Sequence, residues 1–218
     1  MTQFPASAFR VVVVPVTPFQ QNCSLVYNNE TKRGVVVDPG GNVDVITAAI
    51  AKAGVTIERI LITHGHIDHA GGADELREAL GVPVEGPHVA DKYLLDNLPA
   101  SGLRFDITDA RALVPDRWLK ENDVVDVAGF SFRAIEAPGH SPGSVVLFCE
   151  EARFALMGDV LFQNSVGRTD LPGGDHETLI TSIRDKILPL GDDVVFLPGH
   201  GAASRIGDER TSNPFLQR

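Results

Sequence analysis

The sequence predicts an α/β protein in which two β-sheets pack against each other and helices cover their outer faces. Three observations favour this fold class. Short runs rich in β-branched residues occur in two groups, one in each half of the chain. Segments with apolar residues at helical spacing lie between and after these runs. The hydrophobic content of 43% and the 21 glycines suit a loop-rich protein with a substantial core.

The first half of the chain is predicted to alternate strands with helices. A helix is expected over Val43–Ala53, because its apolar residues recur at helical spacing and Gly54 follows as a stop. Two further helices are expected, over Ala73–Leu80 and over Ala90–Leu98. The expected strands are short apolar runs, namely Val11–Val14, Ser24–Tyr27, Val35–Val37, Ile60–Thr63 and Val82–Glu85.

The second half is predicted to form an antiparallel meander. A helix follows it over His176–Leu188, with Asp175 as the N-cap, and Val194–Leu197 is the last expected strand. No linker or low-complexity segment divides the chain, so residues 1–218 are expected to form one domain. The four meander strands are closely spaced and are expected at Val124–Val127, Phe130–Ile135, Val145–Cys149 and Phe154–Met157.

The charge and hydropathy of the chain argue against several classes of binding partner and against insertion into a membrane. The net charge is −10 and no basic cluster occurs, which argues against nucleic acid and against an anionic membrane surface. No apolar run approaches 18 residues, and Met1–Arg10 lacks the basic start and apolar core of a secretory signal. With only Cys23 and Cys149, the protein is expected to be reduced and cytoplasmic. Cys23 is expected to be a small buried hydrophobe rather than a functional thiol.

The run from Thr63 to His69 carries the strongest functional signal. It places three imidazoles and a carboxylate within six residues, directly after an apolar stretch, and these are ligands that zinc, iron and manganese prefer. His64 and His66 are two residues apart, so on extended backbone they point to the same side and can bind one ion. Asp68 and His69 follow as the chain turns toward the next helix, and they are expected to face a second ion. The alternative is a polar loop with chance histidines.

Three further residues follow apolar runs in the same way. His140 follows Pro-Gly, His200 follows Pro-Gly, and Asp159 follows Gly. One candidate ligand after an apolar run would indicate only a turn. Together, the residues at these positions predict a metal centre built at the ends of strands. His88 and His176 fall outside the pattern and are expected to be solvated.

The order of these motifs, His-x-His-x-Asp-His, Pro-Gly-His, Gly-Asp and Pro-Gly-His, resembles the metallo-β-lactamase superfamily of hydrolases. The resemblance implies an αββα four-layer sandwich with two divalent metal ions. Zinc is the first expectation for these ions, and iron and manganese are the alternatives. It also implies the ligands of each ion. The first ion would be held by His64, His66 and His140, the second by Asp68, His69 and His200, and Asp159 would bridge the two.

Within that superfamily the chain resembles the glyoxalase II, or hydroxyacylglutathione hydrolase, branch and its short bacterial members. The carboxy-terminal helical domain of the full-length enzymes is expected to be absent, because the chain ends shortly after Gly201. The resemblance implies hydrolysis of a glutathione thioester such as S-lactoylglutathione, and hence methylglyoxal detoxification. It rests on the segments Pro18–Cys23, Val37–Gly41, Thr63–Gly72, Pro138–Ser144, Gly167–Asp170, Pro198–Gly201 and Asn213–Leu216.

The same resemblance suggests roles around the metals. A hydroxide that bridges the two ions would attack the thioester carbonyl, and Asp68 is a candidate proton shuttle. Asp38 is a candidate to accept the N–H of a metal-bound histidine, with a turn aspartate as the alternative. Arg168 is a candidate to bind a glutathione carboxylate, because enzymes of this branch have a basic residue at the matching place. The alternative is a surface arginine paired with Asp170.

Three other functions are also compatible with the sequence. The first is a mononuclear-iron glutathione persulfide dioxygenase, which the chain resembles at Gly167–Asp170 and at Arg210–Pro214. The form of the turns at Pro138–Ser144 and Pro198–Gly201 favours the hydrolase. A metallo-hydrolase of another ester, lactone or β-lactam is the second, and a binding module without catalysis is the third.

Overall fold

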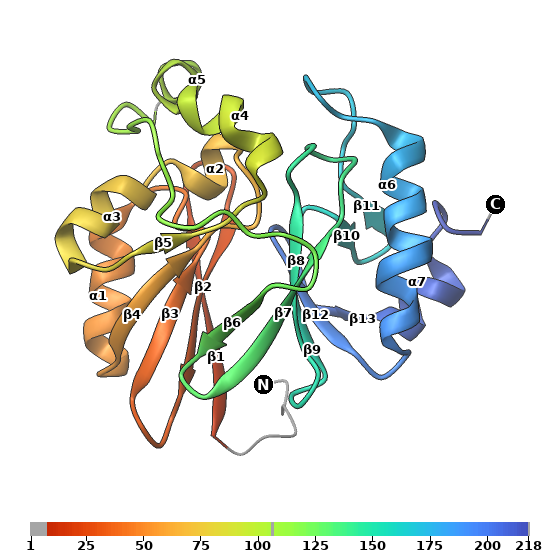
Figure 1. The fold of residues 1–218 in the computed structure, drawn as a ribbon, viewed down its shortest axis with the longest axis horizontal. Coiled ribbons are helices and arrows are strands. Elements are labelled where there is room, and N and C mark those ends of the chain that lie inside the picture. Colours follow the sequence, from red (N-terminus) through yellow and green to blue (C-terminus); the bar gives the residue numbers. More distant parts are fainter. Residues whose placement is uncertain (1–7, 106, 218) are drawn as a thin grey trace.

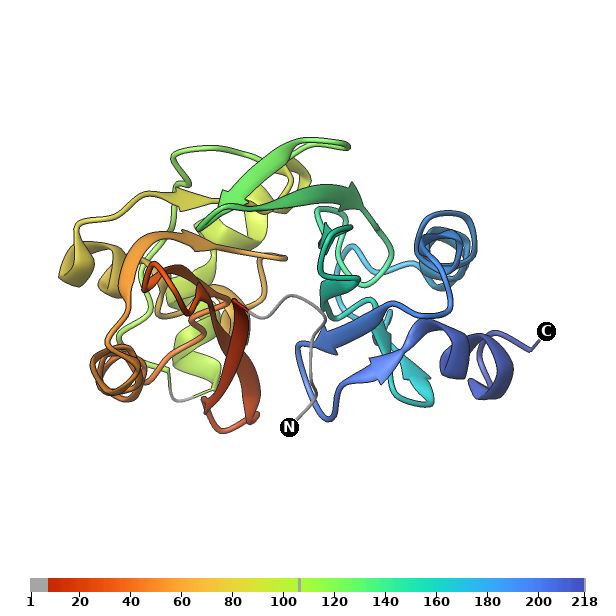
Figure 2. The same ribbon diagram turned by 90° about the horizontal axis from the view of Figure 1, so that it is seen from below.

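The computed structural model describes residues 8–105 and 107–217, so most of the segment Met1–Arg10 lies outside the described residues. Two sheets form the middle layers, and helices cover both outer faces (Figure 1). Helices α1 (Val43–Ala53) and α3 (Ala73–Leu80) lie outside the first sheet. Helices α6 (His176–Ser182) and α7 (Ile206–Ser212) lie outside the second (Figure 2). The αββα fold class is therefore confirmed.

The first sheet mixes antiparallel and parallel pairing. Its strands, in sheet order, are β1 (Phe9–Val16), β2 (Gln21–Asn28), β3 (Arg33–Val37), β4 (Thr56–Leu61) and β5 (Val84–Glu85). Strands β3, β4 and β5 run parallel, so the chain leaves all three at one edge of the sheet. The strand expected over Ile60–Thr63 begins earlier and ends at Leu61, because the Thr63 N–H donates to the Asp38 carboxylate instead of to a neighbouring strand.

The second sheet contains the expected antiparallel meander. Its strands, in sheet order, are β13 (Ser204–Arg205), β12 (Val195–Pro198), β9 (Phe154–Gly158), β8 (Val145–Cys149), β7 (Phe130–Glu136) and β6 (Val124–Val127). Strands β12 and β9 run parallel, with Pro198 beside Gly158. The residues that follow these two strands therefore leave the sheet at the same edge.

Two expected helices are interrupted. The segment Ala90–Leu98 forms a 3₁₀ turn at Val89–Asp91 and then two short helices, α4 (Lys92–Asp96) and α5 (Leu98–Arg104). The helix expected over His176–Leu188 is α6, which continues as a π-helical turn over Ile183–Ile187. Its N-cap is confirmed, because Asp175 Oδ1 accepts a hydrogen bond from the Thr178 N–H at 2.7 Å. A short helix missing from the sequence prediction, α2 (Ile67–Ala70), follows the loop after β4.

Three apolar layers fill the spaces between the four layers of secondary structure. Ile46 and Leu76 pack helices α1 and α3 against the first sheet. Phe9, Phe132 and Phe154 lie between the sheets, where the Phe9 and Phe154 rings are 5.4 Å apart. Leu179, Ile183 and Phe196 pack α6 and its π-helical turn against the second sheet. Central strand β8 is buried on both faces, which explains its unbroken apolar sequence.

Within the described ranges, no helix combines the length and the hydropathy that crossing a membrane requires.

The layer between the sheets is expected to dominate stability. Replacing the fully buried Phe132 by Ala should lower the free energy of unfolding by about 3–5 kcal/mol, because apolar contact is lost and a cavity is left. The control is Val124→Ala, at a position 56% exposed on neighbouring β6. It should change the free energy of unfolding by less than about 0.5 kcal/mol. Urea unfolding followed by circular dichroism measures both. Equal effects would contradict the burial of Phe132.

Candidate metal centre

The candidate ligands gather where strands of both sheets end, near α2 in Figure 1. The loop after β4 carries His64 and His66, and α2 carries Asp68 and His69. The second sheet supplies the rest, namely His140 between β7 and β8, Asp159 after β9 and His200 after β12. All seven residues singled out in the sequence therefore lie together, although they span much of the chain.

Their nitrogen and oxygen atoms form three overlapping groups, within each of which all ligand atoms lie within 4.8 Å of one another. The groups are His64, His66 and His140, then Asp68, His69 and His200, and finally His64, His69 and Asp159. The Asp159 carboxylate lies between the first two groups. Its Oδ2 is 3.7 Å from His140 Nε2 and 3.6 Å from His200 Nε2. The arrangement could hold two neighbouring cations.

A cation would account for the close approach of several of these atoms. His140 Nε2 lies 2.9 Å from His66 Nδ1 and 3.2 Å from His64 Nε2, so three imidazole nitrogens converge. His69 Nε2 and Asp159 Oδ1 are buried 3.4 Å apart, and neither has a hydrogen-bond partner among the described residues. Burying polar atoms without partners is unfavourable. Imidazole nitrogen and carboxylate oxygen suit zinc, iron or manganese, so the residues fit a divalent metal.

Two members of the three-histidine group, His64 and His66, favour the neutral imidazole. Burial lowers the pKa of His64 well below its ordinary value, and the neighbouring histidines lower it further. Burial and the nearby His140 lower the pKa of His66 to about 4. Since a metal binds the neutral imidazole, these side chains are ready to act as ligands at neutral pH.

The group around His69 behaves differently. Burial lowers the pKa of His69, but the carboxylates of Asp159, Asp68 and Asp38 outweigh burial and raise it well above its ordinary value. The pKa of His200 is also raised, because the 3.1 Å contact from its Nε2 to Asp68 Oδ2 outweighs burial. In the metal-free protein this group therefore retains protons to higher pH.

Two acceptors fix the histidine rings. Asp38 Oδ2 lies 2.9 Å from His69 Nδ1, and Asp38 also accepts the N–H and the hydroxyl of Thr63. The main-chain carbonyl of Arg168 lies 2.8 Å from His140 Nδ1. With protons on these two Nδ1 atoms, both rings present the Nε2 lone pair to the cluster. Asp38 thus occupies the position expected of an orienting carboxylate.

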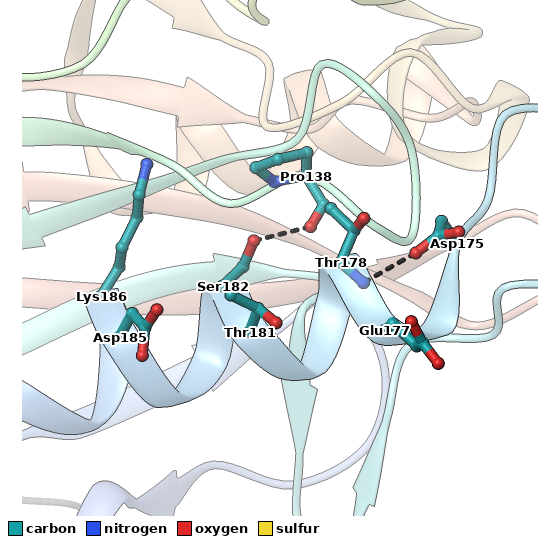
Figure 3. Close-up of a pocket in the computed structure, with 8 residues that line it drawn as sticks. All are labelled: Pro138, Asp175, Glu177, Thr178, Thr181, Ser182, Asp185 and Lys186. Atoms are coloured by element: carbon teal, nitrogen blue, oxygen red, sulfur yellow. Dashed lines mark hydrogen bonds between the residues drawn. The ribbon is translucent and has the colours of Figure 1, made fainter.

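Helix α6 holds the turn that carries His140. The Ser182 hydroxyl donates to the Pro138 carbonyl at 2.8 Å, and the Asp175 N–H donates to the Gly139 carbonyl at 2.8 Å. Figure 3 shows the first contact at the edge of an open groove along α6. The groove is lined by Pro138, Asp175, Glu177, Thr178, Thr181, Ser182, Asp185 and Lys186. Helix α6 therefore supports the site from outside.

The Arg168 side chain lies on the surface. Its guanidinium makes two 2.7 Å hydrogen bonds to the Asp170 carboxylate, and this contact lowers the pKa of Asp170 to about 2. The pairing is the one that the alternative interpretation of Arg168 predicts. A role of its side chain toward substrate stays a prediction, whereas its main-chain carbonyl contacts His140.

The remaining histidines and Cys23 lie where the sequence placed them. His176 is exposed, and the partly exposed His88 accepts a hydrogen bond from the Ala90 N–H. Neither belongs to a metal-binding group of the described residues. The Cys23 thiol is buried, and burial raises its pKa, so it is neutral and unreactive at neutral pH.

Sequence reasoning missed Asp91, and within the segment Pro138–Ser144 it overlooked a second pattern, the pentapeptide Gly139–Gly143. The pentapeptide matches Gly-x-Ser-x-Gly, the nucleophile elbow of serine hydrolases. An elbow joins a strand to a helix, whereas this turn joins strands β7 and β8. The Ser141 hydroxyl is fully buried and donates to Asp91. Asp91 itself is fully buried inside a segment predicted as ordinary helix, so only its acidic character could have drawn attention to it.

Comparison with known proteins agrees with this geometry. The pattern that defines the Metallo-beta-lactamase superfamily matches residues 16–200. Hydroxyacylglutathione hydrolase GloC of Haemophilus influenzae is 44% identical over 94% of this chain and 97% of its own length. The crystal structure of the BLEG-1 B3 metallo-beta-lactamase is 36% identical, with a TM-score of 0.88 over 96% of this chain and all of that one. The structure of TTHA1623 in a di-iron-bound form is 35% identical, with a TM-score of 0.84 over 94% of this chain and all of that one. The chain belongs to the metallo-beta-lactamase superfamily.

Proposed function

We propose that this protein is a metal-dependent hydrolase that cleaves a glutathione thioester of the S-lactoylglutathione type, and so acts in methylglyoxal detoxification. The observation that carries the proposal is the pair of adjacent ligand groups with Asp159 between them. The name of the relative from Haemophilus influenzae, which is similar over almost its whole length, supports the choice of substrate.

In this proposal His64, His66 and His140 would hold one ion, Asp68, His69 and His200 would hold the other, and Asp159 is available to both groups. Zinc is the first choice because the site is rich in imidazole, and iron is the next because one similar protein is known in a di-iron-bound form. When bound, such metals lower the pKa of a water toward about 7 and polarise a carbonyl group.

The chain itself supplies orientation and proton transfer. Asp38 and the Arg168 carbonyl hold the rings of His69 and His140. Asp68 stays ionised at neutral pH, because His69 and His200 lower its pKa more than burial raises it. In the proposed role Asp68 would pass a proton on rather than retain it, because a carboxylate with a lowered pKa is a weak base. The leaving thiol has a pKa of about 8.5, so the thiolate departs without a strong acid from the protein.

Location in the cytoplasm is part of the proposal. Cys23 and Cys149 are both buried and unpaired, which suits a reducing compartment.

Metal content and thioester turnover, measured together, test the function. Protein loaded with zinc is expected to hold about two ions per chain and to hydrolyse S-lactoylglutathione. Asp68→Asn should lower both the second-metal occupancy and the rate, the rate by about 10- to 1000-fold, because a ligand and a proton acceptor are lost together. Elemental analysis and release of free thiol are the two readouts.

Other results would redirect the proposal. Unchanged occupancy and rate in Asp68→Asn would remove Asp68 from the site. About one iron per chain, oxygen uptake with glutathione persulfide and no thioester turnover would instead support the dioxygenase. Two ions with turnover of a lactone or another ester, and none of S-lactoylglutathione, would keep the hydrolase and replace the substrate.

The two ligand groups are expected to respond differently to pH. The raised pKa values of His69 and His200 mean that each is protonated below its pKa and loses the proton as pH rises through it. Metal must displace these protons, so affinity should rise by about tenfold per pH unit for each proton displaced, and level off above the raised pKa values. His64 and His66 have lowered pKa values and should compete little with metal at neutral pH.

Zinc titration against a competing chelator between about pH 6 and 8 resolves the two binding steps, and proton release in weak buffer counts the displaced protons. Identical pH dependence of both steps would contradict the assignment.

Arg168 is expected to contribute to substrate affinity. Arg168→Ala should raise KM for S-lactoylglutathione by about 3- to 10-fold and leave kcat nearly unchanged, because a partly exposed charged contact away from the reacting bond is lost. Asp170→Ala is the matched control, since it frees the guanidinium and should lower KM. An unchanged KM in Arg168→Ala would contradict a role in substrate binding and leave the surface ion pair with Asp170 as the only role of this side chain.

A further inference from the structure

We propose that Asp91 is a positioning residue that sets the geometry of the group His64, His66 and His140 by joining the loop of one sheet to the turn of the other. The inference rests on the metal groups assigned above, but it does not depend on the identity of the substrate.

The Asp91 carboxylate binds segments that carry the three histidines. Its Oδ2 accepts the Gly65 N–H at 2.8 Å and the Ser141 hydroxyl at 2.7 Å. Its Oδ1 accepts the Gly143 N–H at 2.6 Å. Gly65 lies between His64 and His66, and Ser141 follows His140. One buried carboxylate therefore forms hydrogen bonds to residues that are adjacent in sequence to each of the three candidate ligands.

The surroundings are shaped to let this carboxylate fit. A Cβ atom at Gly143 would lie 2.6 Å from Asp91 Cγ. A Cβ atom at Gly65 would lie 2.8 Å from Leu94 Cβ and 3.2 Å from Asp91 Cβ. Both main chains thus approach Asp91 and α4 more closely than any other residue type would permit.

Three donors that come only from ligand-bearing segments are hard to explain by stability alone. Burial of a carboxylate is unfavourable unless hydrogen bonds offset it, and an apolar residue would fill the space at lower cost. The three bonds join the β4 loop of the first sheet to the β7–β8 turn of the second. They therefore fix the distance between His64 and His66 on one side and His140 on the other.

A different residue ties down the turn of the second group. The Asn22 side-chain amide donates to the Pro198 carbonyl at 3.0 Å and to the Gly201 carbonyl at 2.9 Å, and its main-chain N–H donates to the Gly199 carbonyl. These contacts surround His200. Because the two turns are anchored by separate side chains, the loss of one anchor should disturb one group and spare the other.

The test counts zinc in variants that already lack one group. Asp91→Ala alone is expected to keep one tight zinc and to weaken the other by about 10- to 100-fold, the size seen when residues that orient ligands are removed. In a His140→Ala background, where the three-histidine group is already broken, Asp91→Ala should cause no further loss. In a His200→Ala background it should remove the remaining tight zinc. Asn22→Ala is the matched variant and should show the reverse pattern.

Two further variants cover a failure of Asp91→Ala to fold, which circular dichroism of the chelator-treated protein would detect. Asp91→Asn keeps the shape but turns an amide N–H₂ toward a donor, so it should give the same selective loss, smaller in size. Gly143→Ala keeps the Asp91 carboxylate but displaces it. This variant should also weaken zinc binding by the group His64, His66 and His140.

Equal zinc loss in both histidine backgrounds would show a general structural role and overturn the inference. Two tight zinc ions in both Asp91 variants and in Gly143→Ala would overturn it as well, while leaving the proposed function intact. A wild-type chain that binds no zinc or iron would overturn both proposals together.

Discussion

Both groups of candidate ligands take side chains from the two sheets, so their geometry depends on how closely the ends of the sheets are held together. The apolar layer that contains Phe9 and Phe132 fills the space between the sheets. Such packing is not directional, and it sets separation better than it sets orientation. Directional contacts complete the alignment at the site, where the Val145 N–H donates to the Thr63 carbonyl and Asp91 accepts three hydrogen bonds.

The two groups differ in charge, and the difference follows from what surrounds each of them. At His64 and His66 burial is the largest influence, and it favours the neutral rings. His69 lies among Asp38, Asp68 and Asp159, so electrostatic attraction outweighs burial and favours the charged ring. Asp159 faces both groups. A metal ion would therefore enter one group with little proton competition and enter the other only by displacing protons.

The ligand cluster was predictable from the sequence because each segment that carries candidate ligands follows an apolar run, and the parallel pairs β3–β4 and β9–β12 bring such ends to one edge. Asp91 was not predictable, because its role depends on two loops that approach it only in the folded chain. The break at Asn97 has a local cause that the prediction overlooked, because Pro99 lies in the first turn of α5 and favours the start of a new helix. Strands β10 (Leu161–Phe162), β11 (Ser165–Val166) and β13 are too short to show a period.

The metal groups alone do not select a substrate, because polarising a carbonyl and activating water serve esters, thioesters and lactams alike. Selection must come from side chains that contact the rest of the substrate. Arg168 is suited to this, since its main chain holds His140 while its guanidinium reaches the surface. An exposed ion pair contributes little to stability. In the proposed function, a substrate carboxylate would therefore displace Asp170 from the Arg168 guanidinium at little cost.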